Sequence, residues 1–221
     1  MSVAVIVLGA GGHARVVIDA LQRAGVEIAG LCAPELPKGM VGPLGVTSLG
    51  NDGALSALDP AAYLLANGIG STGRSDIRDR LFDEYSRDGW RFATVIHPSA
   101  IIGGDCSVHE GAQIMAGAVV QSGCVIGRNT IVNTASSLDH DCRIGDYSHV
   151  APGAVLCGAV CVGERSHIGT GAVVIQGVSI GSEVLIGAGA TICRDVITGD
   201  RVPAGAVVRR KQAPHPGRDG Q

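Results

Sequence analysis

A histidine flanked by two acids, Asp139-His140-Asp141, is the feature of this sequence best suited to acid–base chemistry. Imidazole exchanges a proton near pH 7, so a positioned histidine serves as a general base toward an amine or a hydroxyl. A neighbouring carboxylate fixes the tautomer of the ring and stabilises the imidazolium that forms. The sequence leaves open which acid has this role, Asp139 or Asp141. The alternative interpretation is a surface histidine among solvated acids.

Two further histidines, His149 and His167, follow His140 in the sequence. Neutral imidazoles are common zinc ligands, so three of them on one face would form a metal site that activates water. This zinc hypothesis is the minor alternative, because it leaves the N-terminal part of the chain unexplained.

A glycine-rich turn near the N-terminus, Gly9-Ala10-Gly11-Gly12-His13-Ala14, follows an apolar run and precedes a segment with helical spacing. Backbone N–H groups at the start of a helix face a bound anion, so the turn predicts a phosphate site. It also fits the dinucleotide pattern G-x-G-x-x-G/A. No acid stands at the end of the second strand, at Cys32 and Ala33, and the segment is short. A single nucleotide diphosphate is therefore favoured over NAD, and a purely structural turn is the alternative.

The elements that position His140 follow from a hexapeptide repeat. From Ile102 to Ile192 every sixth residue is Ile, Val or Leu, sixteen in all. Such hexapeptides predict a triangular prism of short parallel strands, with three hexapeptides in each coil and the aliphatic side chains inside. Leu138 then points inward, and His140 lies on the outer surface near a turn. His149 and His167 are separated by one coil and fall in one column.

Small residues occupy a second position of the repeat, four residues after the aliphatic one. Cys106, Cys124 and Cys142 occupy this position in successive coils and are expected to stack there. We interpret them as small core residues rather than metal ligands. The seven cysteines, odd in number and without a CxxC pair, indicate reduced thiols in a cytoplasmic protein.

Residues 1–97 lack the hexapeptide repeat and contain short apolar runs that alternate with segments of helical spacing. This pattern predicts a small Rossmann-like α/β domain. The expected strands are 3–8, 27–32 and 63–66, and the expected helices are 15–23 and 75–86. The β-helix domain is expected over 98–211, followed by a disordered tail over 212–221.

The composition excludes several classes of protein. The formal net charge of −3 means that the protein as a whole has no positive electrostatic field to attract nucleic acid. The chain has no uninterrupted apolar run long enough to predict a membrane span. Aromatic residues make up 3% of the chain and hydrophobic residues 46%, which indicates a narrow, aliphatic core.

The Gly-Ala-Gly-Gly-His turn, the short α/β segment and the hexapeptides with their His–acid pair together resemble the bacterial hexapeptide-repeat nucleotide-sugar acetyltransferases. The resemblance covers nearly the full length. The family includes enzymes that N-acetylate UDP-4-amino sugars on the way to bacillosamine, perosamine N-acetyltransferases and sialic acid O-acetyltransferases. It implies a left-handed parallel β-helix after the α/β domain, acetyl-CoA as cosubstrate, no metal, and a homotrimer that closes the acyl-CoA groove between prisms.

The resemblance also implies roles for particular residues. The expected site consists of His140 and Asp141 in catalysis; His149, Gly158, Thr170 and Ala188 at acetyl-CoA; and Gly11, Gly12 and His13 at the nucleotide sugar. Asp141 departs from the many relatives that have Glu after the His. His149 is expected near the thioester, where it helps to hold the oxyanion. Arg209, Arg210 and Lys211 either attract the CoA phosphates or form a solvated basic end.

The function implied is N-acetylation of the 4-amino group of a nucleotide-linked 4-amino-4,6-dideoxy sugar for bacterial glycan synthesis, such as lipopolysaccharide. GDP-perosamine is favoured, because uridine-type relatives often carry an acid where Cys32-Ala33-Pro34 stands. The alternatives are a sialic acid O-acetyltransferase, a zinc hydratase like the γ-class carbonic anhydrases, and a non-catalytic trimer that binds nucleotide sugars.

Overall fold

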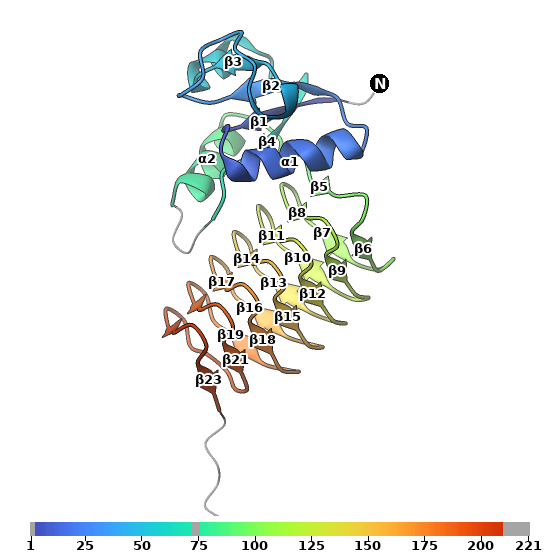
Figure 1. Cartoon of the computed structure of the whole chain (residues 1–221), viewed down its shortest axis with the longest axis vertical. Helices are drawn as coiled ribbons and strands as arrows, with labels where there is room; N and C mark the ends of the chain where they lie inside the picture. The colour runs from blue at the N-terminus through green and yellow to red at the C-terminus, as the bar shows by residue number, and fades with distance from the viewer. Residues whose placement is uncertain (1–2, 72–75, 210–221) are drawn as a thin grey trace, which may run out of the picture.

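The computed structural model describes residues 3–71 and 76–209, which form an α/β domain stacked on one end of a long prism (Figure 1). The domain holds a parallel sheet with the strand order β3-β2-β1-β4. Its elements are β1 (Ala4–Leu8), α1 (Gly12–Arg23), β2 (Ile28–Cys32), β3 (Ser48–Gly50), β4 (Tyr63–Asn67) and α2 (Asp76–Arg87), with 3-10 helices at Pro43–Gly45 and Asp52–Ala57. The three expected strands and both expected helices are present, and α1 begins earlier than expected, at Gly12.

Both faces of this sheet are covered, as the apolar run in β1 predicts. Val5 and Val7 pack on one side with the buried stripe of α1, and Ile6 and Leu8 pack on the other side with Phe82 of α2. The carboxyl ends of β1, β2 and β4 therefore meet at one edge, beside the start of α1.

The prism consists of three parallel sheets, which we call faces 1, 2 and 3. Face 1 contains β5 (Val95–Ile96), β8 (Gln113–Ile114), β11 (Ile131–Val132), β14 (His149–Val150), β17 (His167–Ile168), β20 (Leu185–Ile186) and β22 (Arg201–Val202). Face 2 contains β6 (Ile101–Ile102), β9 (Val119–Val120), β12 (Ser137–Leu138), β15 (Val155–Leu156), β18 (Val173–Val174), β21 (Thr191–Ile192) and β23 (Val207–Val208). Face 3 contains β7 (Ser107–Val108), β10 (Val125–Ile126), β13 (Arg143–Ile144), β16 (Cys161–Val162) and β19 (Ser179–Ile180).

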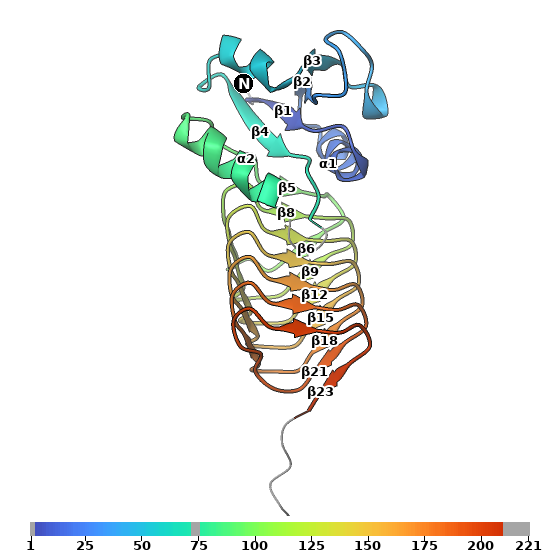
Figure 2. The same ribbon diagram turned by 90° about the vertical axis from the view of Figure 1, so that its left-hand side faces the viewer.

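The hexapeptide repeat sets this architecture. The aliphatic residue of each repeat is the second residue of a two-residue strand and points into the prism, where all sixteen belong to or pack against one core cluster. Partner strands are separated by three hexapeptides through most of the prism, so each coil pairs with the next (Figure 2). The expected fold class, an α/β domain followed by a left-handed parallel β-helix, is confirmed.

The stacked cysteines also lie where the repeat predicts. Cys124 and Cys142 are fully buried in the prism core, and Cys106 packs against it. Burial raises the pKa of the Cys142 thiol to about 12, so this thiol stays protonated. All seven cysteines are reduced thiols, and those buried in the prism are packing residues.

The prism begins before residue 98, because β5 already pairs with β8 as the first strand of face 1. The α/β domain also docks along the corner between faces 3 and 1. There the Tyr147 hydroxyl donates a hydrogen bond to Asp83 of α2, and the Arg165 guanidinium stacks on the Tyr147 ring at 4.5 Å. This interface fixes the domain over the first coils of the prism. Within residues 3–71 and 76–209, no helix is long and apolar enough to cross a membrane.

Candidate active site

His140 lies on the turn between β12 and β13, at the corner between faces 2 and 3, and its side chain is 53% exposed. Its Nδ1 lies 2.8 Å from Asp141 Oδ2, and its backbone N–H donates to Asp139 Oδ1. Asp141 therefore orients the ring, and Asp139 caps the turn. The pKa of His140 is raised, first by the hydrogen bond to Asp141 and then by the charge of Asp139. With Nδ1–H given to Asp141, the lone pair of Nε2 is free to take a proton.

Gly158 lies directly against this ring, one coil further along the prism. A Cβ atom at Gly158 would lie 2.5 Å from His140 Nε2. The glycine therefore leaves room for the imidazole, and the structure places this expected acetyl-CoA contact beside the candidate base.

A pocket of about 590 Å³ opens on face 1 and at the corner between faces 1 and 2. It is lined by Gly12, His13, Val16, Gly70, Ser71, Asn133, His149, Ala151, Pro152, His167, Gly169, Thr170, Leu185, Ile186, Gly187 and Ala188. We call it the face 1 pocket. It brings together three expected acetyl-CoA residues, His149, Thr170 and Ala188, with two expected nucleotide-sugar residues, Gly12 and His13.

His149 is buried in this pocket, and both of its ring nitrogens are engaged. Nδ1 lies 2.8 Å from the carbonyl oxygen of Ser71 and must donate to it, so Nε2 accepts from the Asn133 amide at 3.0 Å. Burial, and next the proximity of His167, lower the pKa of His149 to about 3. The neutral ring has no free N–H for an oxyanion, whereas Asn133 retains a second amide hydrogen.

His167 packs edge-on against His149, with ring centroids 4.8 Å apart. Burial lowers its pKa, and its buried Nδ1 has no hydrogen-bond partner in the described part of the chain. An unpaired polar atom beside a pocket is suited to a bound ligand.

A second pocket, of about 630 Å³, lies at the carboxyl end of the α/β sheet. We call it the turn pocket. It is lined by Leu8, Gly9, Ala10, Gly11, Gly12, His13, Cys32, Pro34, Glu35, Gly68, Ile69, Gly70, Ile77, Arg80 and Leu81. Gly12, His13 and Gly70 line both pockets, so the two pockets adjoin at these residues.

The glycines of the turn have different roles. Gly9 has a φ of +91°, and a Cβ there would lie 2.8 Å from Ile69 Cδ1, so the fold itself requires glycine. Gly11 and Gly12 have ordinary φ angles and open space where a Cβ would be. Among the described residues, no side chain caps the start of α1 at Gly11. The first N–H groups of α1 are therefore accessible to an anion in the turn pocket.

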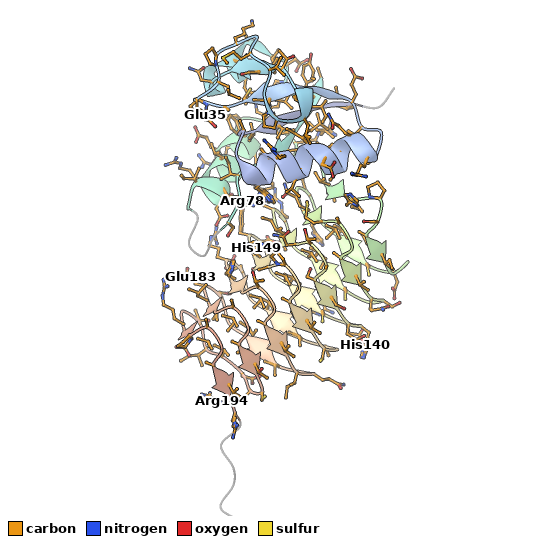
Figure 3. The ribbon with its side chains drawn as sticks, viewed as in Figure 1. Glu35, Arg78, His140, His149, Glu183 and Arg194 are labelled. Carbon is orange, nitrogen blue, oxygen red and sulfur yellow. The ribbon has the colours of Figure 1, made fainter. Side chains whose placement is uncertain are left out.

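His140 is not among the residues that line either pocket. Figure 3 shows His140 and His149 on opposite sides of the prism. His140 follows β12 and lies at the corner between faces 2 and 3. Asn133, which bonds to His149 in the face 1 pocket, precedes β12 and lies at the corner between faces 1 and 2. The two histidines therefore lie near opposite long edges of face 2. This separation corrects the idea of three histidines on one face: only His149 and His167 share a column. No group of three or more His, Cys, Asp or Glu side chains in residues 3–71 and 76–209 is placed to hold a metal.

Several pocket residues were not identified from the sequence. Glu35 lines the turn pocket shortly after β2 ends, so an acid does stand near this strand end, directly after Cys32-Ala33-Pro34. Asn133 was detectable, because it lies two residues after Ile131, which pairs with His149 in the next coil. Gln113 and Arg78 are buried residues that line neither pocket, and they carry no sequence signal. Arg209 is exposed, whereas Arg210, Lys211 and the expected tail lie outside the described residues.

Comparison with known proteins supports these assignments of fold and family. Residues 4–85 match the PglD N-terminal domain, and residues 105–134 and 123–158 match the bacterial transferase hexapeptide repeats. Perosamine N-acetyltransferase from Caulobacter crescentus, solved in complex with CoA and GDP-perosamine, is 34% identical over 92% of each chain, with a TM-score of 0.79. The acetyltransferase domain of PglB from Neisseria gonorrhoeae, solved with acetyl coenzyme A, is 33% identical over 93% of this chain and 98% of that one, with a TM-score of 0.84.

Both the identity and the coverage extend through the α/β domain and the prism, so the resemblance found in the sequence is confirmed. WeeI from Acinetobacter baumannii, at 23% identity and a TM-score of 0.77, shares the fold. The chain belongs to the hexapeptide-repeat nucleotide-sugar acetyltransferase family and is an acetyltransferase.

Proposed function

We propose that this enzyme transfers the acetyl group of acetyl-CoA to the 4-amino group of a nucleotide-linked 4-amino-4,6-dideoxy sugar, and that the nucleotide sugar is GDP-perosamine. The observation that carries the proposal is that the turn pocket and the face 1 pocket adjoin at Gly12, His13 and Gly70. A nucleotide diphosphate at the start of α1 extends its sugar toward the prism. The similar enzyme crystallised with CoA and GDP-perosamine supports the choice of substrate.

Because Glu35 follows β2 and lines the turn pocket, the sequence argument against a uridine nucleotide no longer holds. The choice of guanine rests instead on the hydrogen bonds that Glu35 offers. The base edge of guanine presents two adjacent N–H donors, which a carboxylate accepts together, whereas uracil presents one. The sugar then lies in the face 1 pocket, and the extended arm of acetyl-CoA follows the small residues Thr170 and Ala188. His167, whose buried Nδ1 is unpaired in the described part of the chain, lines the same pocket.

The chemistry needs the amine, the thioester carbonyl and His140 within reach of one another. The neutral amine forms a C–N bond to the acetyl carbon, and His140 Nε2 removes a proton from the amine nitrogen. Asp141 stabilises the resulting imidazolium. The C–S bond then breaks, and the proton passes to the sulfur of CoA. No acyl-enzyme is involved, in keeping with the protonated, buried thiols of Cys124 and Cys142.

A second protomer completes this site in our proposal. The outward side chains of face 2 carry no charge; they are Ile101, Val119, Ser137, Val155, Val173, Thr191 and Val207. Ile101 is 64% exposed and Val207 is 52% exposed, which is costly for apolar groups in water. Three prisms with face 2 turned toward a threefold axis bury this surface. The His140 edge of one protomer then meets the face 1 pocket of its neighbour.

The experiment is a panel of acceptors, assayed by release of the CoA thiol: GDP-perosamine, UDP-linked 4-amino sugars, GDP-mannose and a sialic acid. We expect GDP-perosamine to have the highest kcat/KM. Preference for a UDP-linked amine would show that the nucleobase is uracil rather than guanine. Efficient turnover of the sialic acid would show that the acceptor is a hydroxyl of that sugar rather than the amine of a nucleotide sugar. Zinc-dependent hydration of CO2 without CoA release would overturn the proposal.

A further inference from the structure

A buried polar network joins the glycine-rich turn to the prism. His13 Nε2 lies 2.7 Å from Gln113 Oε1, and Gln113 Nε2 lies 2.7 Å from the carbonyl oxygen of Asn67. Gln113 is the outward residue of β8, yet the α/β domain covers it completely. A carbonyl oxygen only accepts hydrogen bonds, so the NH2 group of Gln113 must face Asn67. The Oε1 atom of Gln113 therefore faces His13.

This orientation determines the tautomer of His13. Because Gln113 Oε1 can only accept, the hydrogen of the neutral imidazole must be on Nε2, and Nδ1 carries the lone pair. Burial and then the nearby Arg78 guanidinium lower the pKa of His13 to about 4, so the ring is neutral at physiological pH. Nδ1 makes no hydrogen bond in the described ranges, and the side chain lines both pockets.

The fold also holds Gln113 in place. The Asn67 carbonyl accepts a second bond from the buried Arg78 Nη1 at 3.0 Å. Arg78 further donates to the carbonyl oxygens of Ile69, at 2.7 Å, and Asn129, at 3.2 Å. The network therefore ties β4, α2 and the prism together, and a flip of the Gln113 amide would face two acceptor oxygens toward each other.

We propose that Gln113 is a positioning residue, which fixes His13 with its hydrogen on Nε2 so that Nδ1 accepts a hydrogen bond from a hydroxyl of the substrate's sugar ring. This inference rests on the proposed function, because it requires a nucleotide sugar in the two pockets. The inference narrows the expected role of His13 in binding the nucleotide sugar. The lone pair on Nδ1 would be repelled by a phosphate, so His13 contacts the sugar rather than the diphosphate. The N–H groups at the start of α1 bind the diphosphate, and His13 reads the sugar. A sugar without that hydroxyl leaves Nδ1 unpaired and is rejected.

The charged and titratable groups around His13 are Arg78 on α2 and His149 on β14. Arg78 disfavours a charge on His13, and His149 is itself neutral. A carboxylate at position 113 would oppose Arg78 and favour the imidazolium, which carries hydrogen on both nitrogens. Nδ1 would then be a donor, and its bond to the sugar hydroxyl would have to reverse.

The first test is the tautomer of His13 in the full-length enzyme with and without GDP, by 15N NMR of histidine-labelled protein, with His13→Gln to assign the signal. We expect hydrogen on Nε2 and a bare Nδ1 at pH 7. Hydrogen on Nδ1 in the wild-type protein would overturn the inference, whatever the enzyme's activity. Failure of GDP to bind would instead contradict the proposed function, so the two failures are distinguishable.

The second test compares Gln113→Met and Gln113→Glu with wild type on GDP-perosamine and on its analogues deoxygenated at C2 or C3. For Gln113→Met we expect the KM for GDP-perosamine to rise about tenfold, with kcat less affected. The analogue that lacks the hydroxyl bound by His13 should have a raised KM with the wild-type enzyme. Gln113→Met should not raise the KM for this analogue any further. In Gln113→Glu the KM should fall as pH rises and His13 loses its proton. Equal KM increases for every substrate at every pH would indicate a merely structural role and overturn the inference.

Discussion

The imidazole of His140 lies directly over Gly158, so close that a Cβ atom at this glycine would lie 2.5 Å from Nε2. Gly158 has no positive φ, so Gly158→Ala should fold normally while the methyl group displaces the ring. We expect kcat to fall by at least about tenfold, part of the roughly 10²–10⁴ that a general base contributes. Steady-state kinetics measure this effect. Gly104→Ala, at a glycine with open space, is the control. Unchanged turnover in Gly158→Ala would show that this position of the ring is not the reactive one.

Gly12 offers a similar test for the nucleotide. Its Cβ position is open, so Gly12→Val should leave the unfolding temperature nearly unchanged. The added side chain lies at the start of α1 and obstructs the approach of a diphosphate to the backbone N–H groups. We expect GDP affinity, measured by calorimetry, to fall by about tenfold or more, in line with one or two lost charge-assisted hydrogen bonds. Undiminished GDP binding would show that the nucleotide binds in another pocket.

The outward side chains of face 2 test the assembly. Val155 is 40% exposed in the single chain, so Val155→Lys should not disturb the prism core. A charge buried between neighbouring protomers is costly, and we expect sedimentation equilibrium to show dissociation, with loss of activity. Ser179→Lys, at an exposed position on face 3, is the matched control and should remain trimeric. A monomeric wild-type enzyme with full activity would refute the shared site.

Acid should destabilise the fold through its buried histidines. The pKa values of His13 and His149 are lowered from 6.5 to about 4 and about 3, so between pH 6.5 and 4 the unfolded chain binds more protons than the native one. The free energy of unfolding therefore falls as the pH falls through this window, by about 2 kcal/mol per histidine at pH 5. Urea denaturation at pH 7 and pH 5 measures the loss, and His149→Gln should reduce it. A loss that is the same in His149→Gln would assign the acid sensitivity to other groups.

Much of this structure is predictable because it is repetitive or local. The period from Ile102 to Ile192 sets the prism, and Gly9 sets the turn before α1, since each feature depends on near neighbours in the chain. The contact between Asp141 and His140 is also local, although it takes the three-dimensional structure to show that Asp141 contacts the ring and Asp139 the backbone. The pairings of His13 with Gln113 and of Arg78 with Asn129 are not predictable. They join residues far apart in the sequence, which the docking of two domains brings together.

The most direct test of the account is to identify the product formed from GDP-perosamine and acetyl-CoA. NMR should locate one new acetyl group on the nitrogen at C4, and kcat should fall by roughly 10²–10⁴ in His140→Asn and by less in Asp141→Asn. Acetyl-CoA affinity should persist in both variants. The acidic limb of the kcat/KM profile should lie above the ordinary pKa of histidine, because the pKa of His140 is raised. An acetyl group on oxygen, or near-wild-type turnover in His140→Asn, would contradict the account.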